Sequence, residues 1–468
     1  MSDAASQQSD GDAPQPTDGP TSAAPARTGA VRAVQRAERP LRPALGAAYL
    51  AASWTWVIGM FFPVLLTGDF GWWAWLVFAL PNVIGAASVG LLLRKPGAAK
   101  RFADKHRFAT GWFSAVTIAF HIYAVAWLVR LVLGGRNADL LPGLFRDLSV
   151  TLGMSSFFVL TAAFAFLPFR IAARAAVVVL AVSVACFALA ALGLWVDPMG
   201  SAGFSLPPAP EPLTPALIAL AWIAPVIVAG FLLCPYLDLT INRVRQETAE
   251  PGGSYAFAGG FGGPFLLMIL GTLGYAGYFA THGSLPLIII LHVVVQAAFT
   301  TGVHIRAVFA GDLLRVGPRA AQRRRFRTGR RPLAAWRVFL AVFLLLAMGP
   351  LGNAAIDFGN VAGRTGYSFA RLGYETFMLM YGVVFPLAMW CFAIRPAWLG
   401  SATASRRRVA FIVGVALGLP LVSAGYLFED WYLATVGLLA GGVASVLTAV
   451  GSRAASPGHA QPDHHASA

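Results

Sequence analysis

The side chains best suited to chemistry in this sequence lie inside one apolar stretch, 285–306, which reads LPLIIILHVVVQAAFTTGVHIR. It is long and apolar enough to cross a bilayer as a helix. Hydrocarbon penalises a polar side chain unless another protein group or water receives it, so this helix should face inward. The stretch holds five polar groups: His292, Gln296, Thr300, Thr301 and His304.

Helical spacing groups these residues in two ways, because successive residues advance by about 100°. Steps of four from His292 to His304 place four polar groups along one side of the helix. Ala297, Thr300 and Thr301 share a second face, where a small residue and two hydroxyls could bind a dehydrated small ion. Alternatively, the hydroxyls bond carbonyls of their own helix and serve helix packing. Both interpretations remain open.

Further candidates lie in other apolar segments. His121, in TIAFHIYAVAW, could contact substrate, relay protons or bond a neighbouring carbonyl. Three tryptophans could line a pocket for an apolar or cationic solute, or could simply pack. The predicted substrate-binding set is Trp54, Trp56, His121, Trp222, His292 and Gln296.

The composition is that of a membrane protein. Hydrophobic residues make up 57% of the 468 residues and charged residues 12%, about half the charged fraction of a soluble domain. The net charge of +15 does not indicate nucleic-acid binding, because the basic residues sort by loop as a topology signal. The three cysteines form no CxxC pair and no plausible disulfide framework.

The apolar segments predict an all-α, polytopic membrane protein with about twelve transmembrane helices. Lys and Arg are concentrated in alternate loops, so both termini are expected in the cytoplasm. The predicted domains are a disordered tail over 1–43, a transmembrane domain over 44–452 and a second tail over 453–468. The segments are expected near 45–66, 71–93, 110–133, 148–168, 174–196, 214–238, 257–281, 285–308, 335–356, 371–394, 409–427 and 432–451.

Proline and glycine interrupt the first and sixth segments. Gly59 and Pro63 lie past the middle of the first, and Pro225 and Gly230 lie within the sixth. Interrupted segments at corresponding places in two halves point to a transporter site at the midplane. The two segments would cross in opposite directions, as in a 5+5 inverted repeat followed by two extra helices. Coincidence is the alternative, since both residues are common in membrane helices.

Two charged clusters mark the ends of predicted spans. Asp238, with Arg243 and Arg245 nearby, is interpreted as a solvated helix end rather than as a gate salt bridge. Arg371 and Glu375 have the i,i+4 spacing of a local ion pair.

With its Ala-x-x-Thr-Thr sequence in the eighth segment and breaks in the first and sixth, the chain resembles the LeuT-type fold over roughly 45–451. Sodium:solute symporters, neurotransmitter:sodium symporters and the amino acid–polyamine superfamily share that fold. The resemblance implies that Ala297, Thr300 and Thr301 bind a sodium ion. Backbone carbonyls from a break within 53–59 would complete the site.

These observations predict a secondary active transporter of a small solute, Na⁺- or H⁺-coupled, in the inner or plasma membrane. The expected partners are the lipid bilayer and the solute, with no nucleic acid. No catalytic residue is predicted, and no metal or cofactor beyond a possible Na⁺. The alternatives are a non-transporting scaffold or assembly protein and, less favoured, a lipid transferase with His292 as base. The oligomeric state stays open.

Overall fold

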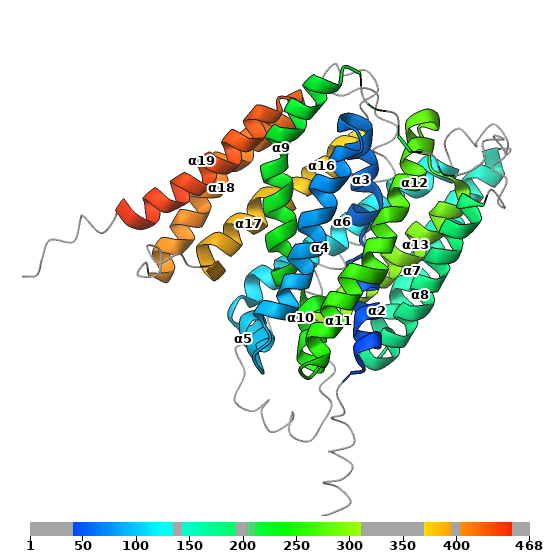
Figure 1. The fold of residues 1–468 in the computed structure, drawn as a ribbon, viewed down its shortest axis with the longest axis horizontal. Helices are drawn as coiled ribbons and strands as arrows, with labels where there is room; N and C mark the ends of the chain where they lie inside the picture. The colour runs from blue at the N-terminus through cyan, green and yellow to red at the C-terminus, as the bar shows by residue number, and fades with distance from the viewer. Residues whose placement is uncertain are drawn as a thin grey trace, which may run out of the picture. The chain divides into compact units, whose positions relative to one another are not determined.

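The computed structural model describes residues 41–133, 143–192, 211–309, 369–394 and 403–451, with four single positions between 204 and 209. Every regular element in these ranges is a helix (Figure 1). Ten helices are long and apolar enough to cross a membrane, or up to eleven if a bent pair forms one span. The prediction of an all-α, multi-pass membrane protein is therefore confirmed. The predicted span 335–356 and both tails beyond 41–451 lie outside the described residues.

The helices follow the predicted segments closely. The first part of the chain contains α2 (Pro43–Trp54), α3 (Val57–Phe70), α4 (Trp73–Leu92), α5 (Ala98–Lys105), α6 (Arg107–Leu133), α7 (Gly143–Phe166) and α8 (Phe169–Ala191). The middle contains α9 (Leu213–Leu233), the 3₁₀ turn η2 (Cys234–Leu237), α10 (Leu239–Glu247), α11 (Gly252–Gly260), η3 (Phe261–Phe265), α12 (Leu266–His282) and α13 (Leu287–Phe309). The last part contains α16 (Phe369–Leu379), η4 (Met380–Val384), α17 (Phe385–Ala388), η5 (Met389–Ile394), α18 (Ala404–Phe428) and α19 (Trp431–Gly451).

The first span is broken, as predicted, but neither Gly59 nor Pro63 forms the break. Helices α2 and α3 meet at a bend of 55°, and both of those residues lie within α3. At the bend, the amide of Trp56 donates to the carbonyl of Trp54 over 2.9 Å. Thr55 has φ −76° and ψ 75°, close to the inverse γ-turn. One tight turn therefore replaces a helical hydrogen bond.

The sixth span differs from the prediction, because α9 continues through Pro225 without a break. Neighbouring side chains can satisfy backbone groups around a proline in a membrane helix. Here Thr435 Oγ1 of α19 donates to the carbonyl of Trp222, in the turn before Pro225. The helix changes only at its end, in η2, before the chain turns into α10.

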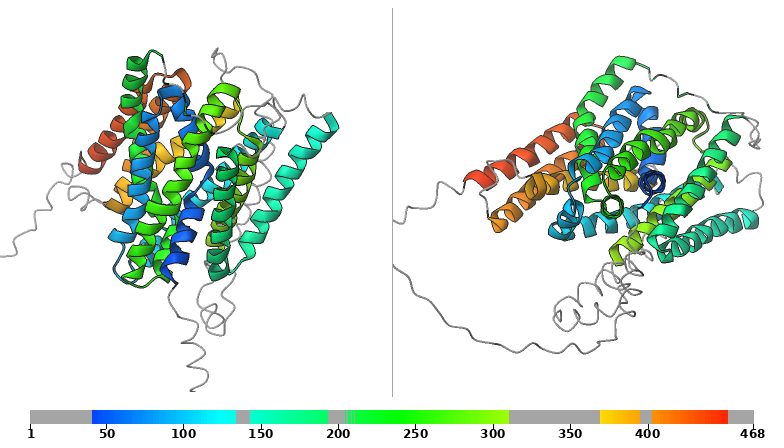
Figure 2. Two further views of the ribbon diagram at one scale, coloured as in Figure 1. Left: turned by 45° about the vertical axis from the view of Figure 1, so that its right-hand side comes forward. Right: turned by 60° about the horizontal axis from the view of Figure 1, so that its bottom comes forward.

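Helix α13 lies among α2, α6, α7 and α8, and together with α6 it is the most deeply buried span of the described part. The α18–α19 pair packs against α9 at the opposite flank from α7 and α8 (Figures 1 and 2). The predicted inward position of the polar helix is thus confirmed. It is also adjacent to the break, because α2 and α13 contact each other directly.

Candidate functional site

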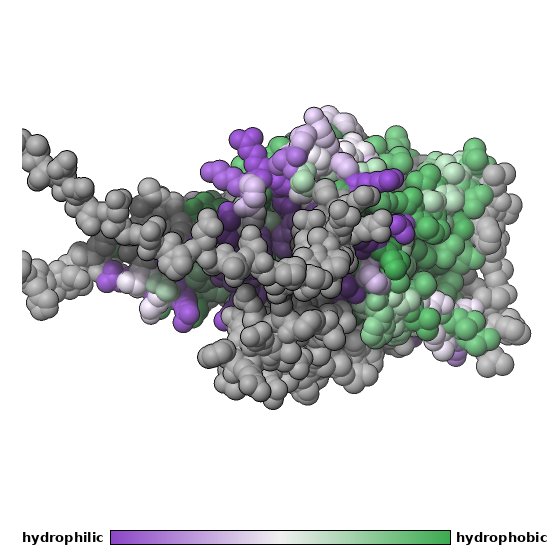
Figure 3. Space-filling model, turned by 90° about the horizontal axis from the view of Figure 1, so that it is seen from below, coloured by the Kyte–Doolittle hydropathy of each residue, from purple (hydrophilic) through white to green (hydrophobic). Residues whose placement is uncertain are grey.

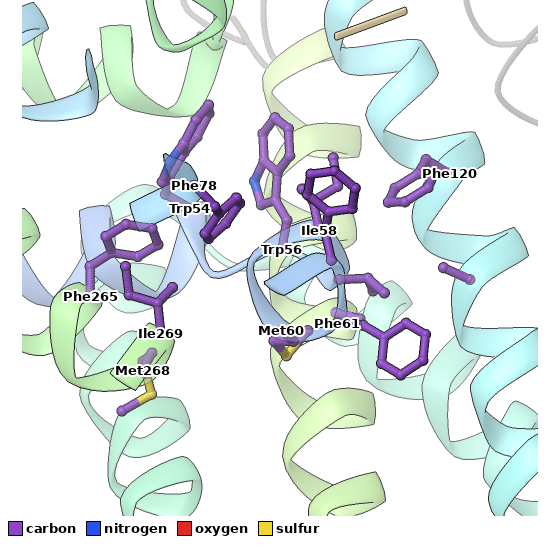
Figure 4. Packing of buried hydrophobic residues seen from close by; sticks show 14 of the residues in the cluster. Trp54, Trp56, Ile58, Met60, Phe61, Phe78, Phe120, Phe265, Met268 and Ile269 are labelled. Atoms are coloured by element: carbon purple, nitrogen blue, oxygen red, sulfur yellow. The ribbon is translucent and has the colours of Figure 1, made fainter. Parts of the chain in front are cut away.

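The break between α2 and α3 lies among aromatic rings, and Figure 4 shows Trp54 and Trp56 beside it. Trp56 is 3% exposed. Its ring centroid lies 4.3 Å from that of Trp54 and 5.4 Å from that of Phe113. The rings of His304 and Tyr381 lie 5.6 Å away and that of His121 5.9 Å away. We call these residues the aromatic cluster: Trp54, Trp56, Phe113, His121, His304 and Tyr381.

Side chains satisfy the backbone groups that the bend releases from helical bonding. Thr300 Oγ1 donates to the carbonyl of Ala52 over 3.2 Å. The indole nitrogen of Trp56 donates to the carbonyl of Ser53 over 2.7 Å. The amide of Val57 donates to Nε2 of the His121 ring over 3.4 Å. Since buried backbone groups need such partners, α13 and α6 help to determine the form of the break.

The hydroxyls of Thr300 and Thr301 have different partners. Thr300 reaches across to α2, whereas Thr301 Oγ1 donates to its own-helix carbonyl at Ala297 over 2.7 Å. All three residues are fully buried. Thr301 therefore has the predicted hydrogen bond to a carbonyl of its own helix. Thr300 instead joins α13 to α2. We call the four atoms Ala52 O, Ala297 O, Thr300 Oγ1 and Thr301 Oγ1 the oxygen cluster.

His292 and Gln296 lie on another side of α13, facing α8. The His292 ring lies 4.6 Å from the Phe187 ring, and Gln296 Nε2 donates to Ser183 Oγ over 3.0 Å. Among the described residues, neither ring nitrogen of His292 has a hydrogen-bond partner. Each step of four residues turns the helix by about 40°. The polar residues of α13 therefore face α8 at His292 and Gln296 and face the break at Thr300 and His304.

Trp222 lies apart from the other predicted residues. It is 40% exposed, and its ring lies 4.9 Å from that of Tyr432 on α19. Its ring therefore packs on α19, away from the aromatic cluster. Of the predicted substrate-binding set, the structure brings Trp54, Trp56 and His121 to the break.

Several residues of the site were not identified from the sequence, and Asp238 is the most important of them. Asp238 is fully buried, so its interpretation as a solvated helix end was wrong. Its Oδ1 accepts from Thr240 N over 2.5 Å and from Thr240 Oγ1 over 2.7 Å, capping α10. Its Oδ2 lies 3.5 Å from His304 Nε2. The sequence did contain a signal for this role, because an acidic residue directly before a short polar segment is typical of a helix N-cap.

Comparison with known proteins gives a structural similarity without a sequence match. No protein-family model matches the sequence, and the search of curated proteins found no match. Among solved structures, the chain is similar to the crystal structure of MhsT in complex with L-phenylalanine. The two chains are 13% identical with a TM-score of 0.39, and the similarity covers 85% of this chain and 98% of that one.

Proposed function

We propose that this protein is a secondary active transporter of a small solute, driven by a gradient of Na⁺ or H⁺ across the cell membrane. The observation that carries the proposal is the hydrogen bond from Thr300 Oγ1 to the carbonyl of Ala52. It joins a fully buried hydroxyl to a backbone group of a broken span. Irregular backbone at membrane depth is tolerated where it is buried in protein or lines a cavity, and transporters use it to bind ions and substrates.

The break offers two complementary ends. The carbonyl end of α2, at Ala52 and Ser53, is negative, and the amide end of α3, at Val57, is positive. A cation would therefore be stabilised at the first end and an anionic group at the second. A zwitterionic or carboxylate-bearing solute together with a cation fits both ends.

The oxygen cluster supports a small hard cation, because such ions prefer oxygen ligands. Its hydroxyls keep lone pairs when their hydrogens rotate away from Ala52 O and Ala297 O. These oxygens form two pairs, with 3.2 Å between Thr300 Oγ1 and Ala52 O and 2.7 Å between Thr301 Oγ1 and Ala297 O. We propose that Na⁺ binds there.

The aromatic cluster supports an apolar or cationic portion of the solute. Trp56 and Tyr381 present ring faces and edges next to the break, where ring packing and cation–π attraction would act together. The solute would then contact Trp54, Trp56 and His121 of the predicted set. His292 and Gln296 lie one or more turns away, facing α8.

Uptake into reconstituted vesicles tests this proposal. A panel of radiolabelled amino acids, amines and organic cations would be offered with and without an inward Na⁺ gradient. We expect accumulation of at least one solute, stimulated by the gradient and lost in Thr300→Ala with Thr301→Ala. Thr448→Ala is the control, because that hydroxyl donates to its own-helix carbonyl at Ala444, on α19. Na⁺-stimulated uptake that survives the double substitution would remove the proposed ion site. Absence of uptake across the panel would favour a scaffold.

A further inference from the structure

A buried acid–base pair lies at the end of α13 nearest to α10. His304 of α13 and Asp238, which precedes α10, are both fully buried. His304 Nε2 and Asp238 Oδ2 are 3.5 Å apart, and neither atom has a hydrogen-bond partner among the described residues. Two ionisable groups that face each other in this way are rare inside a membrane protein and are functional candidates.

The surroundings of Asp238 favour its carboxylate form. Its Oδ1 accepts from Thr240 N over 2.5 Å, from Thr240 Oγ1 over 2.7 Å and from Ile241 N over 3.3 Å. The positive end of α10, a helix of nine residues, points at the same oxygen. The second oxygen, Oδ2, is left facing the imidazole of His304. A proton on His304 would neutralise that charge.

The neighbours of His304 are compatible with both the neutral and the protonated ring. Its Nδ1 lies 3.2 Å from Ser114 Oγ of α6. A hydroxyl can donate to a bare ring nitrogen or accept from a protonated one. The ring also stands edge to face with Trp56, with centroids 5.6 Å apart. His304 thus connects the acid–base pair to the residue at the centre of the broken span.

Three other ionisable side chains interact electrostatically with the pair. His121 of α6 interacts with His304, and Tyr49 of α2 and Tyr381 of η4 interact with Asp238. Two basic groups, Arg243 of α10 and Arg306 of α13, act on Tyr49. A neutral tyrosine or histidine does not balance a carboxylate, whereas a protonated His304 would place a positive charge opposite Asp238 Oδ2.

Whether the pair of His304 and Asp238 is protonated affects how favourable it is to keep this end of the bundle closed. With one proton between them, His304 and Asp238 have no net charge. Without it, the carboxylate keeps its hydrogen bonds at Oδ1 but its Oδ2 stays buried with no positive charge opposite it, which is unfavourable away from water. Loss of the proton would therefore favour a conformation in which water reaches the pair.

Helix α10 closes this end of the bundle. The amide of Leu41, before α2, donates to the carbonyl of Glu247 over 2.8 Å. Arg245 Nη2 donates to the carbonyl of Arg94 over 2.7 Å, joining α10 to the end of α4. Viewed from this end, hydrophilic residues gather over the middle of the molecule and hydrophobic residues over the flank (Figure 3). The pair lies just inside this closure, where a proton could pass to water once α10 moves.

We propose that His304 and Asp238 form a proton-binding site, occupied while the α10 end is closed and emptied when that end opens. This proposal rests on the proposed transport function and adds H⁺ as a coupled ion. The proton site is separate from the oxygen cluster. When the proton leaves, the N–H bond at His304 Nε2 breaks and an O–H bond to water forms.

The first experiment measures solute uptake into reconstituted vesicles with and without a transmembrane pH gradient. We expect the gradient to change the initial rate several-fold in the unsubstituted protein. His304→Gln and Asp238→Asn should both lose this response, and Asp238→Asn, which lies outside the aromatic cluster, should still exchange solute at equal pH on both sides. His282→Gln, which changes a histidine at the end of α12, is the control and should keep it. Uptake that is insensitive to the pH gradient would overturn the proposal and leave the proposed transport function standing.

The second experiment needs no transport. Tryptophan fluorescence of the purified protein would be titrated with pH, because a protonated His304 should quench Trp56. We expect one transition that is absent from Trp56→Phe and from His304→Gln. Asp238→Asn, which removes the carboxylate that faces the ring, should alter this transition.

Ser114→Ala is a milder variant, which removes only the hydroxyl beside His304 Nδ1. It should alter the same transition while leaving the fold intact. A titration identical in all variants would overturn the proton site. The expected transition in a protein that takes up no solute would support the site and count against the proposed transport function.

Discussion

Arg371 of α16 forms an ion pair with Asp69 in the last turn of α3. The same guanidinium donates from Nε to Glu375 Oε1 over 2.9 Å, so the predicted local pair is present and extends to a second helix. Figure 1 places these helix ends away from α10. One contact therefore ties the second half of the broken span to the tenth predicted span, at the opposite end from the buried His304–Asp238 pair.

Breaking this ion pair should loosen one end of the protein with little loss of stability. The side chains of Arg371 and Asp69 are 20% and 28% exposed, and ion pairs that water reaches contribute about 1 kcal/mol or less. We expect Asp69→Asn, which leaves the pair between Arg371 and the buried Glu375 in place, to raise several-fold the rate at which a maleimide labels a cysteine at the buried position Thr67. Lys100→Ala, which breaks an exposed pair with Asp104 on α5, is the control. Equal labelling rates in both variants would show that the pair between Arg371 and Asp69 does not restrict opening.

The hydrogen bond between Trp54 and Asn82 should stabilise the break. Trp54 Nε1 donates to Asn82 Oδ1 over 2.7 Å, and both side chains are buried. Trp54→Phe would leave the amide oxygen unpaired, at a cost of about 1–3 kcal/mol. We expect a lower thermal unfolding temperature in detergent, and no further loss when Asn82→Ala is added. Additive losses would mean that the two residues stabilise the protein independently. Trp72→Phe, at an exposed position, is the control.

The predictable part of this fold depends on local sequence. Runs of apolar residues determine where spans begin and end, and burying five polar groups forces the segment containing Thr300 to face inward. The exact site of the break could not be read from proline or glycine, because Thr55 and Trp56 form it. Their turn is stabilised by Thr300 and His121, which are far away in the sequence.

The same limit applies to Asp238 and Pro225. Asp238 is buried because α10 folds back against α13, and its partner His304 is distant in sequence. Helix α9 continues through Pro225, and Thr435 of α19, which is even further along the chain, donates to the carbonyl of Trp222 one turn before it. The local sequence indicated a helix break at Pro225 and a solvated side chain at Asp238, but Pro225 lies inside a continuous helix and Asp238 is buried.

His121 should act as a structural acceptor for the break. Its Nδ1 lies 2.7 Å from the carbonyl of Thr117, which requires a hydrogen there and leaves Nε2 free to accept from Val57 N. His121→Phe keeps a ring but leaves the Val57 amide unpaired, at a cost of about 1–3 kcal/mol. We expect a lower unfolding temperature and an unchanged response of uptake to pH. Loss of the pH response with unchanged stability would instead identify His121 as a proton relay.

The α18–α19 pair should be sensitive to single added methyl groups at defined glycines. Gly414 and Gly418 of α18 face Gly437 and Gly441 of α19, in the close approach typical of Gly-x-x-x-Gly pairs. A Cβ at Gly441 would lie 2.7 Å from the carbonyl oxygen of Gly414, whereas a Cβ at the next residue, Gly442, would meet nothing within 4 Å.

Gly441→Ala should therefore push the two helices apart, and overpacking of this kind costs about 1–3 kcal/mol. Gly442→Ala should be neutral or slightly stabilising, because alanine favours the helix more than glycine does. Thermal unfolding in detergent, with limited proteolysis to follow separation of α18 from α19, would measure both effects. Equal shifts in the two variants would mean that helix propensity, and not the contact with Gly414, determines how α19 tolerates substitution.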